Sequence, residues 1–170
     1  MNNQVESIAI TRTRAIEFVL LLGIAIAAPI IPSHNQFITG PIVNATLIIA
    51  VASLGMRDAL LIGLIPSSIA LAVGLLPPVL APMVPFIIVG NAILVIIFGY
   101  LRRRNYWLGL VTGSVLKFAF LFGTSTVVIS LLLDQNLASS VAAMMSWPQL
   151  VTALAGGALA YGFLRAIKKT

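Results

Sequence analysis

The segment VPFIIVGNAILVIIFGYL at residues 84–101 decides the fold class. It contains no charged residue and is followed directly by Arg102, Arg103 and Arg104. A helix needs about 20 apolar residues to cross a hydrocarbon core about 30 Å thick, so this segment has the length of a membrane span with a basic flank. It also lacks the alternating pattern of barrel strands, and in lipid only a helix then satisfies the backbone hydrogen bonds.

Five further apolar stretches of similar length occupy most of the remaining chain. The 170 residues are 60% hydrophobic and 8% charged, whereas soluble domains carry about 25% charged residues. We therefore predict an all-α polytopic membrane protein, a single domain over residues 1–170 built as a six-transmembrane-helix bundle. Residues 1–11 are expected to form a frayed cytoplasmic tail. The predicted spans are 16–33, 37–54, 59–76, 84–101, 107–133 and 148–165.

The distribution of basic residues predicts the orientation of this bundle. Of the ten lysines and arginines, all except Lys117 lie before the first predicted span, after the last one, or in the loops after the second and fourth. The positive-inside rule then places both termini in the cytoplasm, in a prokaryotic cytoplasmic membrane. The basic residues that set this orientation also account for the net charge of +6. Nucleic acid is therefore not expected as a partner. A cleaved signal peptide ending near Ala27 stays open as an alternative for the first span.

The residues of common catalytic and metal sites are missing. The chain has no cysteine, one histidine and four acidic residues, and none of its lysines follows a glycine as in a phosphate-binding loop. Glu6, Glu17, Asp58 and Asp134 all lie at or beyond the ends of the predicted spans. We expect neither enzymatic activity, nor a cofactor, nor a metal site.

Lys117 is the exception to the apolar character of the predicted spans. It lies near the middle of 107–133, where a lysine costs roughly 2.5 to 3.5 kcal/mol on insertion scales. One hypothesis is that a bound ligand supplies its counter-charge, which would suit an anionic substrate. The other is that its long side chain reaches toward the cytoplasmic interface. With either hypothesis, a neutral amine is an alternative to the charged form. Thr124 lies at helical spacing on the same side as Lys117 and extends the polar stripe.

Two asparagines lie at matching depths in different spans. Asn44 and Asn91 are each about seven residues from the predicted external end of their span, or about 10 Å deep. They form either a shared outward-facing site or separate hydrogen bonds between helices. With Gln36 at the external rim, the predicted substrate-binding residues are Asn44, Asn91, Lys117, Gln36 and Thr124.

Two segments carry a resemblance to a known family. Residues 39–45, Thr-Gly-Pro-Ile-Val-Asn-Ala, and residues 85–92, Pro-Phe-Ile-Ile-Val-Gly-Asn-Ala, follow a short polar loop and a proline-rich loop respectively. In this setting they resemble the S components of energy-coupling factor (ECF) transporters, which share the six-helix, N-in and C-in plan. The resemblance implies a membrane subunit that captures a vitamin or related micronutrient from outside. It also implies two kinds of partner, a transmembrane coupling protein and a pair of cytoplasmic ATPases.

The resemblance extends to a possible docking motif in the first span. Small residues in an A-x-x-x-A arrangement contact the coupling protein in that family, and Gly23 and Ala27 match this spacing with glycine in the first position. Packing inside the bundle is the alternative for this pair. At the level of the whole protein, the alternative function is a non-transport scaffold or anchor subunit of a larger complex.

Overall fold

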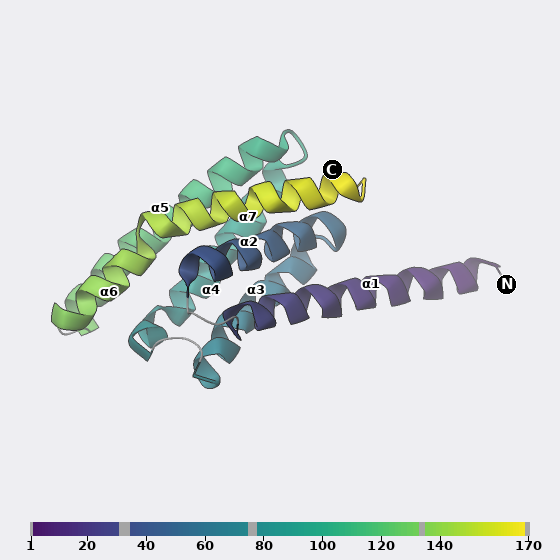
Figure 1. Cartoon of the computed structure of the whole chain (residues 1–170). Coiled ribbons are helices and arrows are strands. Elements are labelled where there is room, and N and C mark those ends of the chain that lie inside the picture. The colour runs from purple at the N-terminus through teal and green to yellow at the C-terminus, as the bar shows by residue number, and fades with distance from the viewer. Residues whose placement is uncertain (1, 31–34, 75–77, 133–134, 169–170) are drawn as a thin grey trace.

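The computed structural model describes residues 2–30, 35–74, 78–132 and 135–168. Within these residues all regular structure is helical and no strand is present, which confirms the all-α prediction (Figure 1). The elements are α1 (Asn2–Ala27), the 3-10 helix η1 (Ala28–Ile30), α2 (Gln36–Ser53), α3 (Met56–Ala72), the 3-10 helix η2 (Pro78–Met83), α4 (Val84–Leu101), α5 (Tyr106–Leu132), α6 (Gln135–Met145) and α7 (Trp147–Ala166).

The helices form a bundle with two different ends. One end, here called the basic end, carries the α2–α3 and α4–α5 turns with Arg57 and residues 102–104. The other, here called the pocket end, carries η1, η2 and α6. In Figure 1 both termini lie on the right and α6 lies at the opposite, left-hand side. The chain therefore crosses from one end of the bundle to the other with each long helix.

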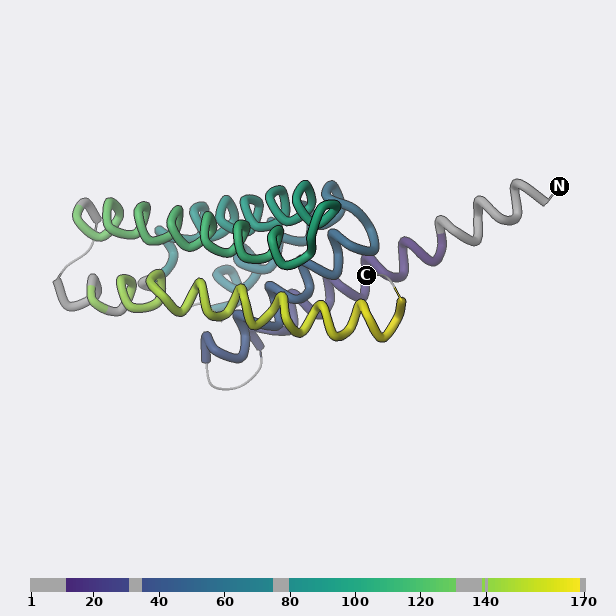
Figure 2. The backbone as a smooth tube through the Cα atoms, turned by 90° about the horizontal axis from the view of Figure 1, so that it is seen from above, coloured from purple at the N-terminus to yellow at the C-terminus, as the bar shows by residue number. Residues whose placement is uncertain are grey.

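Close packing of the bundle depends on small residues. The most extensive helix pairs are α2 with α7 and α4 with α5, which run side by side (Figure 2). A Cβ atom at Gly156 of α7 would lie 2.7 Å from the Pro41 carbonyl oxygen of α2, and one at Gly109 of α5 would lie 3.0 Å from the Arg102 amide nitrogen. Only glycine allows the backbones to approach this closely, as is typical of membrane helix pairs.

Two segments are helical beyond the predicted spans. Residues 2–11 belong to α1, which begins well before the predicted span at residue 16, and the frayed cytoplasmic tail stays a prediction. The segment between the last two predicted spans holds a further helix, α6, whose Ala, Met and Leu residues favour helix although its 11 residues are too few to cross a membrane.

Four helical segments are long and apolar enough to cross a membrane. They are Arg12–Ile30, Gln36–Ser53, Leu80–Leu101 and Tyr106–Ser130. α3 has 17 residues, and α7 begins with Trp147, Pro148 and Gln149, and neither meets the same criteria. The structure is thus consistent with a membrane protein, and the count of six spans stays a prediction.

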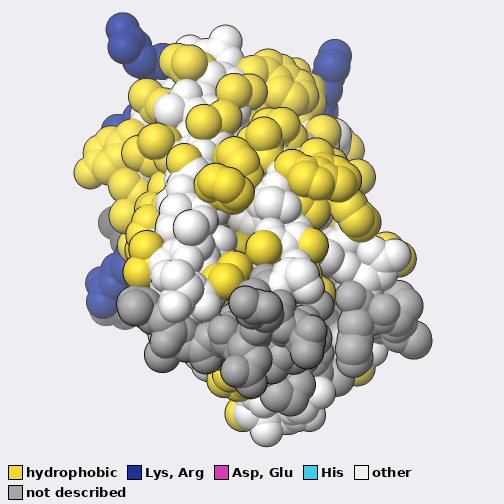
Figure 3. All heavy atoms as spheres, turned by 90° about the vertical axis from the view of Figure 1, so that its left-hand side faces the viewer, with side chains coloured by type: hydrophobic (Ala, Val, Ile, Leu, Met, Phe, Trp, Pro, Cys, Tyr) yellow, Lys and Arg dark blue, Asp and Glu magenta, His cyan; other side chains and the backbone are white. Residues whose placement is uncertain are grey.

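The surface has the character expected of a lipid-facing bundle. Large apolar side chains are exposed along most of the helices, for example Val19 on α1 and Leu159 on α7. When the molecule is viewed from the pocket end, the described Lys and Arg side chains are visible only at the outline (Figure 3). Trp107 near the basic end and Trp147 near the pocket end are both exposed, as in the aromatic belts at the two interfaces of a membrane.

Candidate functional site

A cavity of about 170 Å³ lies in the half of the bundle nearer the pocket end. It is bordered by η1, by η2 and by every helix from α2 to α7. Its described walls are mainly apolar, and its polar groups come from the first half of α2, the second half of α3, the middle of α4 and α5, and the start of α7. The polar lining residues are Gln36, Thr39, Asn44, Ser67, Asn91, Lys117 and Gln149.

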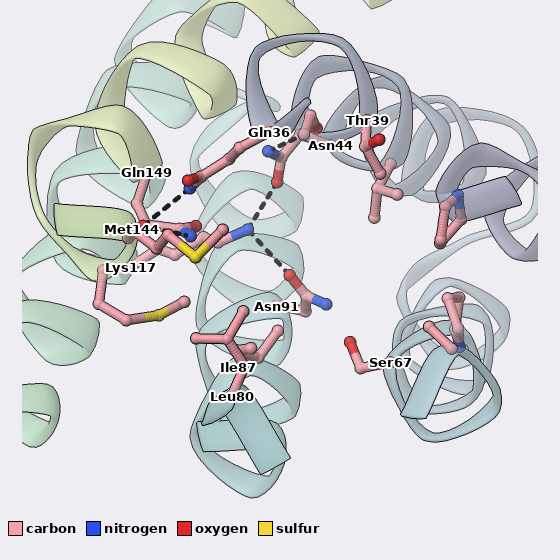
Figure 4. Close-up of a pocket in the computed structure, with 16 residues that line it drawn as sticks. Gln36, Thr39, Asn44, Ser67, Leu80, Ile87, Asn91, Lys117, Met144 and Gln149 are labelled. Atoms are coloured by element: carbon pink, nitrogen blue, oxygen red, sulfur yellow. Dashed lines mark hydrogen bonds between the residues drawn. The ribbon is translucent and has the colours of Figure 1, made fainter. Parts of the chain in front are cut away.

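Lys117 connects three helices at the centre of this cavity. Lys117 is only 3% exposed. Its Nζ donates hydrogen bonds to Asn44 Oδ1 at 2.6 Å and to Asn91 Oδ1 at 2.8 Å (Figure 4). The ammonium group of α5 therefore lies between the amides of α2 and α4. The hypothesis that this side chain reaches the cytoplasmic interface is wrong, because its polar end is buried between the two asparagines.

The surrounding backbone fixes the orientation of both amides. Asn44 Nδ2 donates to the Gly40 carbonyl at 2.9 Å, and Asn91 Nδ2 lies 3.5 Å from the Gly63 carbonyl. Both side-chain oxygens are thereby turned toward the ammonium. Behind Asn44, Gly156 of α7 packs so closely that an added Cβ would lie 2.8 Å from the Asn44 Cβ. The position of the Asn44 amide thus depends on the close approach of α7 to α2.

The positive charge in the cavity has no carboxylate beside it. None of the described lining residues is Asp or Glu, and the carboxylate of Asp58 is paired with Arg14 at 3.0 Å, near the basic end. The two asparagines supply dipoles and hydrogen bonds but no negative charge. A buried charge usually requires a counter-charge or a metal, and the described side chains supply neither to a protonated Lys117.

Two glutamines lie at the edge of the cavity. Gln36 Nε2 and Gln149 Nε2 both donate to the Met144 carbonyl, at 2.8 and 3.1 Å, which ties α2 and α7 to the end of α6 (Figure 4). Gln36 was among the predicted residues, whereas Gln149 and Met144 were not. A polar residue in the first turn of the last predicted span could have indicated Gln149. Met144 lies between the last two predicted spans, in a segment for which no structure was predicted.

Thr124 does not belong to the cavity. Its hydroxyl donates to the Phe120 carbonyl of its own helix at 2.8 Å, and the residue borders a separate apolar hollow with Phe86 and Gly123. Thr124 follows Lys117 by two helical turns, or about 10 Å along α5, and it is not among the residues that line the cavity. Its inclusion among the predicted substrate-binding residues is therefore not supported by this geometry.

Gly23 and Ala27 face away from the bundle. Both are exposed, and no atom lies within 4 Å of a Cβ added at Gly23. The alternative in which this pair packs α1 inside the bundle is wrong. By contrast, Gly109 and Gly113 of α5 contact α4 directly, so the small-residue pairs of this chain serve different surfaces.

The site offers one cation, several amides and an apolar enclosure, which together suit binding of a small molecule. Within the described residues, no group of His, Asp or Glu side chains is suited to hold a metal ion. In comparisons with known proteins, no family model, no curated protein and no solved structure matches the chain. The geometry of the cavity and the sequence are therefore the observations that bear on function.

Proposed function

We propose that this protein is the substrate-binding membrane subunit of a prokaryotic ECF-type importer. In this role it captures a vitamin or related small micronutrient from outside and relies on a separate coupling protein and a pair of ATPases. The observation that carries the proposal is the buried ammonium of Lys117, which lines a cavity and has no carboxylate among the described lining residues. An ionisable group inside a membrane span is energetically costly, and such groups usually have a function.

The location of the cavity supports capture from outside. If the basic end faces the cytoplasm, as the positive-inside rule indicates, the cavity lies in the outer half of the membrane. Both termini are then cytoplasmic, and α3 and α7 complete six spans. At 1.5 Å per residue, the 17 residues of α3 reach about 25 Å, a mismatch that a bilayer accommodates at modest cost.

Two features support dependence on other proteins. The sequence has no phosphate-binding loop, so ATP hydrolysis would have to be supplied by a partner. The exposed Gly23 and Ala27 offer a surface on α1 where another helix can approach closely. We therefore place the contact with the coupling protein on this face.

A scaffold or anchor subunit is the second candidate function. It is favoured by further small residues that face outward, namely Gly123 on α5 and Gly162 on α7, neither of which has an atom within 4 Å of an added Cβ. The two candidates differ in whether the cavity holds a small molecule, since a scaffold has no need of one.

Reconstitution tests the proposed function. The purified protein is placed in liposomes alone or together with a coupling protein and ATPases, and uptake is followed for the small molecule that co-purifies with it. We expect binding without accumulation by the protein alone, and accumulation only when the partners and ATP are present. Accumulation by the lone protein under an ion gradient would contradict the proposal, and absence of any bound molecule would favour the scaffold.

A further inference from the structure

The polar groups around Lys117 Nζ have more hydrogen-bond donors than acceptors left unused. A lysine ammonium has three N–H donors and no acceptor, and two of these donors are used by Asn44 Oδ1 and Asn91 Oδ1. Within the described part of the chain, the third N–H has no partner. Each asparagine Nδ2 has two N–H donors, of which one is directed to the Gly40 or the Gly63 carbonyl and the other is left for a ligand. A ligand placed here meets donors and must therefore supply acceptors.

The charge in the cavity restricts the ligand further. One ammonium and no described carboxylate line the cavity, so a single negative charge gives a neutral pair. A phosphate monoester carries about −1.5 to −2 at pH 7 and would leave a buried negative excess. A cationic ligand would place two like charges together, which is unfavourable. The cavity is thus matched to a monoanion.

The size of the cavity limits the rest of the ligand. Its volume of about 170 Å³ is close to that of an engineered protein cavity of about 150 Å³ that binds benzene, and lies below the roughly 300 to 1,000 Å³ of drug-sized sites. Leu80 and Ile87 provide apolar wall beside the polar groups (Figure 4), and Met145 also lines the cavity. The space bordered by the described residues thus fits about one six-membered ring or an aliphatic group of that size.

We propose that the cavity binds a small monocarboxylate whose apolar body is about the size of one ring. The carboxylate accepts from Lys117 Nζ and from the amide N–H groups of Asn44 and Asn91, and the body packs against the apolar wall. This inference rests on the proposed function and names the chemical class of its substrate.

Calorimetry on the full chain in lipid nanodiscs tests this proposal with benzoate, its neutral isostere benzamide, and phenyl phosphate. We expect benzoate to bind at least about tenfold more tightly than either of the others. Lys117→Met should weaken benzoate binding about 30-fold or more, which is the usual scale for truncating one partner of a buried charge pair. Lys168→Met, which removes a lysine that is exposed beyond the end of α7, should bind benzoate like the wild type.

A second variant protects the test against a folding defect in the first. Asn91→Asp nearly preserves the shape of the side chain but places a carboxylate 2.8 Å from the ammonium, so it should keep the fold and abolish benzoate binding. Equal binding of benzamide and benzoate, normal benzoate binding by Asn91→Asp, or no binding of benzoate to the wild type would overturn the proposal. If another kind of small molecule co-purifies with the wild type, only this inference fails. If none co-purifies and no probe binds, the proposed function fails with it.

Discussion

Among single residues, Lys117 makes the stability of the bundle depend on the polar groups around its side chain. Its ammonium is held by two neutral amides at 2.6 and 2.8 Å. Hydrogen bonds to a charged group contribute about 1.5 to 3 kcal/mol, more than those between neutral groups. Asn44 and Asn91 are thus required for stability as long as the lysine is present, whatever their part in binding.

This dependence can be measured with a double-mutant cycle. We predict that Asn91→Leu lowers the free energy of unfolding by about 2 kcal/mol, because it leaves the buried ammonium with one partner. In a Lys117→Met background the same replacement should cost less than about 1 kcal/mol, since no charge then needs the amide. Unfolding in mixed detergent micelles provides the four values. An equal cost in both backgrounds would show that the two side chains are not coupled.

The sequence allowed the polar residues of the cavity to be identified but not their contacts. Asn44, Asn91 and Lys117 stand out because each interrupts an apolar segment. Spacing along a helix predicts depth, and the two asparagines do lie at one level. Which faces meet depends on how the helices are rotated against each other, and no local pattern encodes that. Thr124 shows the same limit, because it borders a separate hollow and not the cavity around Lys117.

At the scale of elements, the packing of α7 against α2 positions one wall of the cavity. Gly156 lies against Pro41, Asn44 and Ala45 of α2, so no side chain fits between the two backbones at this point. A shift of α7 would therefore displace the Asn44 amide from Lys117.

The helix ends were predicted to within a few residues for most spans because charges, prolines and glycines interrupt the apolar runs. α6 was missed because it is short and lies between two such runs.

Replacement of Gly156 tests this packing. We predict that Gly156→Ala lowers the free energy of unfolding by about 1 to 3 kcal/mol, as is typical of overpacking, and also weakens ligand binding through Asn44. Gly162→Ala on the same helix is the matched control, because no atom lies within 4 Å of its added Cβ, and it should change stability by less than about 1 kcal/mol. Identical thermal midpoints for the two variants would contradict the account.

The exposed face of α1 makes a separate prediction. Gly23→Leu combined with Ala27→Leu should leave stability and ligand binding unchanged, because both positions face away from the bundle. The same double variant should fail to co-purify with the coupling protein, since the larger side chains prevent close approach of a partner helix. Normal complex formation would place the docking face elsewhere, and a lower melting temperature would show that α1 packs differently.

At the scale of the whole molecule, the account depends on which end of the bundle faces the cytoplasm. The arginines at 102–104 and Arg57 lie at one end, and the cavity lies nearer the other. The exposed apolar side chains between the two ends suit lipid contact. Composition, together with the length and continuity of the apolar segments, predicted the membrane class and the all-α fold, because lipid leaves the backbone few alternatives. The existence of a cavity could not be predicted, since it depends on how eight elements border one space.

Cysteine labelling tests the orientation. The natural chain has no cysteine, so Asn35→Cys and Arg103→Cys each carry a single thiol, and both positions are exposed at opposite ends of the bundle. We predict that a membrane-impermeant maleimide labels position 35 in intact cells and position 103 only after permeabilisation. Labelling of both positions from the same side would contradict the orientation and the capture of substrate from outside.

Native mass spectrometry of the protein purified from its own cell type shows whether the cavity around Lys117 holds a small molecule. We expect a bound small molecule in the wild type and in the control variant Lys168→Met, and its loss in Lys117→Met. A wild-type spectrum that shows only the bare chain, or a bound molecule that persists unchanged in Lys117→Met, would contradict this expectation.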